Sequence, residues 1–160
     1  MKNLISRHWD LLISLLIGAE CLQALPNRLS VAFLKDFYYA GLSILALVFS
    51  VVFAAITLLS SIGDNDFLLF LEEEDAALSK LLASFGITLT ALFVSLAISI
   101  GCYGIAAYRS AGSMKDMPCW QFACYCVALS YSLLSACLVG NDVIRFARLR
   151  ARFLAERESA

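Results

Sequence analysis

The 160-residue chain has only one histidine and two prolines. That histidine, His8, has no Ser/His/Asp set, metal-ligand spacing or glycine-rich phosphate loop around it. Charged residues make up 16% of the chain, against about 25% in soluble domains. The sequence predicts no enzymatic activity, no metal, no cofactor and no direct nucleic-acid contact, with a carboxylate-only membrane enzyme as the alternative.

What the chain has instead is hydrophobic side chains, which make up 61% of its residues, with a mean hydropathy of +0.82. Three runs carry no charged residue: Phe37–Gly63, Leu81–Tyr108 and Pro118–Asn141. Each exceeds the roughly 20 apolar residues that a helix needs to cross a bilayer. None alternates as the strands of a membrane barrel do, so the runs predict transmembrane helices.

A fourth, shorter apolar run near the N-terminus is interrupted by Glu20 and ends before Pro26. Trp9–Leu25 provides about 17 residues, the lower limit for a span. Because the acidic residue breaks the apolar region and no cleavage site follows, a signal peptide is disfavoured. We expect a retained first span, with a re-entrant or interfacial helix as the alternative. The four spans are then predicted over residues 9–25, 37–62, 81–108 and 119–144.

Basic residues orient these spans. Eight of them fall on the side of the two termini: Lys2, Arg7, Lys80, Arg145, Arg148, Arg150, Arg152 and Arg157. Four fall on the other side: Arg28, Lys35, Arg109 and Lys115. The sequence therefore predicts an all-α, four-helix transmembrane bundle, formed by residues 1–160 as one domain, with both termini cytosolic and helices that extend into the cytosol.

Two cytosolic segments flank the last two spans. Residues 63–80 form an elbow with an acidic cluster, Glu72, Glu73, Glu74 and Asp75, which is either a solvated helix start or a site for a cation or basic partner. In the tail, residues 145–160, the side chains of Arg145, Arg148 and Arg152 share one helix face. This basic face predicts contact with anionic lipid or with a cytosolic protein.

Small and hydroxyl-bearing residues repeat at helical spacing in three spans. They are Ser43, Ser50 and Thr57; Ser84, Thr88, Ser95 and Ser99; and Ala128, Ser132, Ala136 and Gly140. Small residues mark close helix contacts in lipid, so packing within the chain is one interpretation. The other is that the hydroxyl faces of several copies line a pore. One four-helix chain is too narrow for that, so a pore requires a homo-oligomer.

Glu20 is an acidic residue that interrupts the apolar part of the first predicted span, which makes it a functional candidate. It either reaches the outer interface beside Arg28 or serves as a proton or cation site. The six cysteines are either buried thiols or, for Cys102 and Cys119, an outer disulfide. Cys124 and Cys126 fall on different helix faces, which disfavours a metal site.

Glu20 in "LLIGAECLQAL" resembles the membrane-embedded glutamate of small multidrug exporters, which implies a proton-coupled exporter. The whole layout is similar to small four-span proteins of bacterial phage defence, the Kiwa membrane subunit and RexB-like exclusion proteins. That likeness comes from the uncharged "YYAGLSILALVFSVVFAAITLL", the elbow "DNDFLLFLEEEDAALSK" and the tail "RFARLRARFLAERE". It implies a homo-oligomer in the bacterial inner membrane that acts as a pore or as a platform for a cytosolic partner. A tetraspan assembly factor is the third hypothesis.

Overall fold

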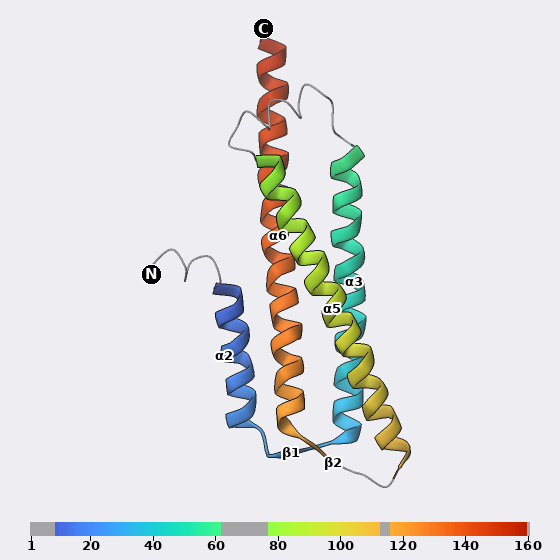
Figure 1. Cartoon of the computed structure of the whole chain (residues 1–160). Helices are drawn as coiled ribbons and strands as arrows, with labels where there is room; N and C mark the ends of the chain where they lie inside the picture. The colour runs from blue at the N-terminus through green and yellow to red at the C-terminus, as the bar shows by residue number, and fades with distance from the viewer. Residues whose placement is uncertain (1–8, 62–76, 113–115, 160) are drawn as a thin grey trace.

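The computed structural model describes residues 9–61, 77–112 and 116–159, with side chains over 9–57, 82–112 and 116–155. Within these ranges it contains four helices and two short strands (Figure 1). The helices are α2 (Trp9–Ala24), α3 (Val31–Ser61), α5 (Ala77–Ala111) and α6 (Cys119–Ser159), and the strands are β1 (Arg28–Ser30) and β2 (Asp116–Pro118).

A small β-ribbon joins the two connections at one end of the bundle. β1 and β2 pair antiparallel, with Leu29 opposite Met117, and the backbone N–H of Cys119 extends the ladder by donating to Asn27. Pro118, which has no N–H, is tolerated because a two-stranded ribbon consists only of edges. The ribbon was not predicted, and apart from its two three-residue strands the described fold is helical, as the sequence predicts.

The ribbon leads directly into α3 and α6 and contacts both of these helices. α3 packs mainly on α5, α2 on α6, and α5 crosses obliquely from α6 toward α3 (Figure 1). A buried cluster at the ribbon end includes Leu34, Tyr38, Phe122 and Tyr125. The rings of Tyr38 and Tyr125 meet edge to face at 4.7 Å between centroids. A second cluster further along joins the three long helices: Leu45, Val52, Phe85, Leu92 and Val139.

The outer surface of the bundle is apolar, as a lipid environment requires. Large hydrophobic side chains such as Leu47, Phe93 and Ile100 are at least 60% exposed. Val31–Thr57, Leu82–Ala111 and Cys119–Ala155 are each long and apolar enough to cross a membrane. These three helices are compatible with a membrane protein.

The helices differ in length, and this matters for the site. At 1.5 Å per residue, α2 is about 24 Å long, short of a hydrocarbon core of about 30 Å. In Figure 1 it stops well before the far end of the bundle. α6, with 41 residues, is about 61 Å long and continues past α3 and α5. The predicted tail is therefore a continuation of the last span, without a break.

The predicted spans 37–62 and 81–108 start a few residues late, since α3 begins at Val31 and α5 at Ala77. Ser30, directly before α3, is a residue type preferred at helix N-termini. Lys35 and Asp36 were assigned to a connection because of their charge, yet they occupy the first turns of α3. Most of the elbow, up to residue 76, lies outside the described residues.

Candidate functional site

A row of hydroxyl groups on α5 meets α6 along much of the bundle. At the end away from the ribbon, the Ser84 hydroxyl donates to the Asp142 carboxylate at 2.8 Å. One turn further, the Thr88 hydroxyl donates to the backbone carbonyl of Ser135 at 3.5 Å. Asp142, the first charged residue of α6, thus has a partner on the neighbouring helix.

The same row continues toward the ribbon. Ser95 donates to the backbone carbonyl of Ala128 at 3.1 Å, and its hydroxyl also contacts that of Ser132. Ser99 donates to the backbone carbonyl of Ser95 on its own helix at 2.7 Å, and also to the hydroxyl oxygen of Tyr125 at 3.3 Å. We call this row of α5 hydroxyls and their α6 partners the polar seam.

The polar seam joins two helices where there is no hydrophobic drive for them to associate. Interhelical hydrogen bonds in membranes average about 0.6 kcal/mol and reach about 1.7 kcal/mol. The three hydroxyl groups nearest the ribbon, those of Ser95, Ser99 and Ser132, are buried. These groups bond across the interface, so the α5 stripe packs helices together within one chain.

The predicted small-residue row of α6 is divided by the structure. Ala128 and Ser132 face α5 in the polar seam, and Ala136 packs on the second buried cluster. Gly140 is exposed, and a Cβ built on it would meet no atom within 4 Å. Three of the four residues therefore lie at helix contacts, and Gly140 does not.

The stripe on α3 has a different surrounding. Ser43, Ser50 and Thr57 are all exposed, and each hydroxyl donates to the carbonyl four residues earlier on its own helix, at 2.6 to 3.0 Å. This back-bonding lets a hydroxyl sit on a lipid-facing surface. The stripe therefore faces the outside of the bundle in a single chain.

Glu20 is exposed on α2, toward the ribbon end. The buried face of the same helix consists of Asp10, Ser14 and Gly18, spaced four residues apart. A Cβ on Gly18 would overlap the side chain of Val127, which shows how closely α2 approaches α6. The Ser14 hydroxyl donates to the Asp10 carbonyl at 2.7 Å.

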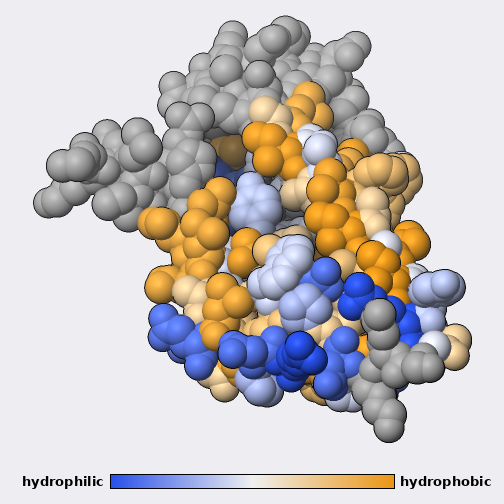
Figure 2. All heavy atoms as spheres, turned by 60° about the horizontal axis from the view of Figure 1, so that its bottom comes forward, coloured by the Kyte–Doolittle hydropathy of each residue, from blue (hydrophilic) through white to orange (hydrophobic). Residues whose placement is uncertain are grey.

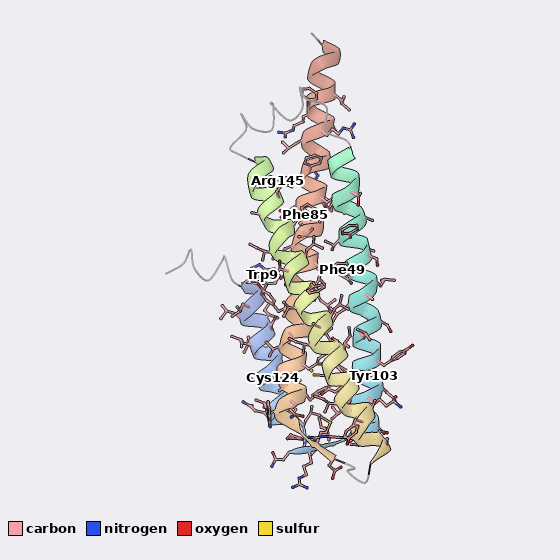
Figure 3. The ribbon with its side chains drawn as sticks, turned by 45° about the vertical axis from the view of Figure 1, so that its right-hand side comes forward. Trp9, Phe49, Phe85, Tyr103, Cys124 and Arg145 are labelled. Carbon is pink, nitrogen blue, oxygen red and sulfur yellow. The ribbon has the colours of Figure 1, made fainter. Side chains whose placement is uncertain are left out.

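Asp10 was missed by the sequence analysis, which placed it at the edge of the first span. It is 8% exposed and lies about 12 Å beyond Gly18 along α2. Figure 3 labels its neighbour Trp9 at the end of α2, far from Cys124 near the ribbon. The available signal was the four-residue spacing from Asp10 to Ser14 and Gly18, which places Asp10 on the same helix face as two small residues. α2 thus presents its buried carboxylate to the bundle, and Glu20 away from it.

The basic residues Arg145, Arg148 and Arg152 are exposed on the far part of α6, while Phe146 is buried and Leu149 half-buried. Arg145 is labelled in Figure 3. The acidic cluster Glu72, Glu73, Glu74 and Asp75 lies outside the described residues.

All six cysteines are free thiols, so Cys102 and Cys119 are not paired. Cys124 is exposed and Cys126 buried, as expected for different helix faces. In the described ranges, no group of three or more His, Cys, Asp or Glu side chains could hold a metal ion.

The described residues therefore form a helical bundle with three helices long and apolar enough to span a membrane, a hydroxyl-bonded α5–α6 interface and a basic helical extension. No protein family, curated protein or solved structure matches this chain.

Proposed function

We propose that this chain is a membrane platform of a bacterial antiphage defence system, which holds a basic helix in the cytosol for a soluble partner. The observation that carries the proposal is the unbroken α6. Its 41 residues start at the ribbon and extend beyond the bundle, with exposed Arg145, Arg148 and Arg152 on the extension. A helix that is continuous with a span holds such residues at a set distance from the bilayer.

The proposed topology has the ribbon outside and the extension of α6 inside. Basic residues are twice as frequent on the proposed inner side, eight against four. Exposed Tyr39, Tyr108 and Trp120 lie at the ribbon end, where interfacial aromatic residues are expected. Figure 2 shows polar side chains gathered at this end, with apolar side chains behind them. Because α2 runs antiparallel to α3, its N-terminus is directed inward, which favours both termini in the cytosol of an inner-membrane protein.

Three features favour a platform over a pore or exporter within one chain. The α5 hydroxyls bond to α6, the α3 hydroxyls face outward, and Glu20 is exposed on α2. None of these groups lines an aqueous path through the bundle. The function in defence rests on the likeness of the layout to Kiwa-type and RexB-like membrane proteins.

The second candidate function is a pore formed by several copies. The observation that favours it is the exposed position of Ser43, Ser50 and Thr57 on one face of α3. In a ring of copies that face could turn toward a shared centre.

Reconstituted vesicles distinguish the two candidates. For a platform, vesicles that contain the intact chain retain a trapped dye and a potassium gradient as well as empty vesicles do. If the wild-type vesicles leak and the substitution Ser50→Leu reduces the leak, the oligomeric pore would be established instead.

Phage plating on bacteria that carry the native locus tests the basic helix. Replacing Arg145, Arg148 and Arg152 together by Gln is expected to abolish protection while the protein stays in the membrane. The matched control, Arg28→Gln with Arg109→Gln, removes charge at the ribbon end and is expected to keep protection. Loss of protection in both variants, or in neither, would contradict the platform.

A further inference from the structure

A groove follows the α5–α6 interface on the outside of the bundle. Its larger part has a volume of about 680 Å³ and is lined by Gly86, Thr90 and Ile98 of α5 and by Ala128 and Tyr131 of α6. Small side chains leave this space open, since a Cβ on Gly86 would meet no atom within 4 Å.

A second hollow of about 260 Å³ continues the groove toward the ribbon. It shares Ile98 with the first and is lined by Cys102, Gln121, Cys124 and Tyr38. Ile98 and Cys102 continue the helix face that carries Gly86 and Thr90, since they are spaced by about one turn. The two hollows are therefore consecutive parts of one feature, which we call the α5–α6 groove.

The groove has a polar group at its ribbon end that the protein does not satisfy. Tyr38 is 0% exposed, and its hydroxyl is the one buried side-chain group in the described residues without a hydrogen-bond partner. The neighbouring Tyr125 differs, because its hydroxyl accepts a bond from Ser99. A buried donor without a partner is costly. Tyr38 also lines the smaller hollow, and a turn of its ring toward the groove would bring the hydroxyl to an acceptor there.

The position of Tyr38 restricts which chemical groups could act as that acceptor. It lies two turns into α3, about 10 Å from the helix start, at the level where exposed Trp120 indicates the membrane interface. From Cys102 to Gly86 the groove runs about 24 Å along α5. One leaflet of a hydrocarbon core is about 15 Å deep, so the groove is long enough for an acyl chain that descends from this interface.

We propose that the α5–α6 groove holds one glycerophospholipid of the outer leaflet, with an acyl chain along α5 and an ester carbonyl that accepts a hydrogen bond from Tyr38. A helix of a second copy fits this site less well. Its backbone carbonyls bond within the helix, and it would leave the Tyr38 hydroxyl unsatisfied. An ester carbonyl supplies the acceptor at the interface, and the chain fills the apolar remainder.

Native mass spectrometry of the intact chain in detergent, titrated with diacyl phosphatidylglycerol, tests the acyl-chain site. The variant Gly86→Leu fills the groove. Gly104→Leu is its matched control on the same helix, because Gly104 also has nothing within 4 Å of an added Cβ and does not line the groove. We expect one lipid to be retained by the wild type and by Gly104→Leu, and at least tenfold weaker retention by Gly86→Leu.

The ester contact is tested with Tyr38→Phe and a diether lipid of the same headgroup and chain length. Removing one neutral hydrogen bond is expected to weaken retention of the diacyl lipid about fivefold. The diether lipid lacks the carbonyl, so Tyr38→Phe is expected to bind it as the wild type does.

Three results would overturn the proposal. The first is equal retention by Gly86→Leu and Gly104→Leu. The second is equal affinity of Tyr38→Phe and the wild type for the diacyl lipid. The third is an oligomer that Gly86→Leu dissociates without change in bound lipid, since a second copy would then occupy the groove.

Discussion

Two stripes of hydroxyl groups, one on α3 and one on α5, repeat with helical spacing in the sequence but have opposite surroundings in the fold. Ser95 and Ser99 of α5 are buried and reach α6. Ser43 and Ser50 of α3 are exposed and bond to their own helix. Periodicity therefore identifies residues that share a face, without identifying what that face contacts.

The difference has a physical cause on the partner helix. A serine in a helix can always donate to the carbonyl four residues earlier, so a stripe needs no partner to lie in lipid. It becomes an interface where the neighbour also has small residues at the same level. Ala128 and Ser132 of α6 supply that match for Ser95.

The largest effect is expected from a bulky substitution in the α5–α6 interface, compared with the same substitution in the α3 stripe. Ser132→Leu is expected to lower the free energy of unfolding by about 2 kcal/mol, because the site is fully buried and overpacking forces the helices apart. Ser50→Leu is expected to change it little. Equilibrium unfolding of the protein in mixed micelles measures both. A comparable loss from Ser50→Leu would mean that another copy covers the α3 stripe, and the contrast would fail.

A double-mutant cycle on Ser95 and Ser132 sharpens the contrast. Replacing both by Ala is expected to reveal a coupling free energy of about 0.6 kcal/mol, the average for hydrogen bonds between membrane helices. The same cycle on Ser43 and Ser50 serves as the control, with no coupling expected because these hydroxyls bond within α3. Coupling of equal size in both pairs would remove the distinction.

The smallest expected effect concerns the two carboxylates of α2. Asp10 is buried in the first turn, where the helix dipole favours a negative charge, and Glu20 is exposed toward the other end. Asp10→Asn is expected to lower the free energy of unfolding by about 0.5 kcal/mol. Glu20→Gln should leave it unchanged or raise it slightly. A larger loss from Glu20→Gln than from Asp10→Asn would contradict the assignment of Asp10 as the buried carboxylate of α2.

Much of the fold was accessible without coordinates. Uncharged runs predicted the three long helices, since only a helix or closed barrel satisfies its backbone within lipid. The helical continuation of the last span was predicted from the spacing of Arg145, Arg148 and Arg152 together with the absence of Gly and Pro. The ribbon was not predicted, because each of its strands has three residues and is formed only by pairing with the other.

Candidate functional residues were predicted less well, because burial also depends on contacts between segments far apart in the chain. Glu20 was chosen because it stands within an apolar run, whereas Asp10 stands at its edge. Burial depends on which side of α2 meets α6, and the close approach at Gly18 decides that. The unsatisfied hydroxyl of Tyr38 and the groove beside it had no sequence signal at all.

The sequence by itself determined that the chain forms long apolar helices able to span a membrane, and where those helices lie. Those properties follow from local hydropathy and from the backbone's need for hydrogen bonds in lipid. Only the tertiary structure decided which hydroxyls join helices, which carboxylate is buried and where the α5–α6 groove runs. These depend on how far α5 diverges from α6 and how closely α2 approaches it, distances that arise from packing between segments far apart in the chain.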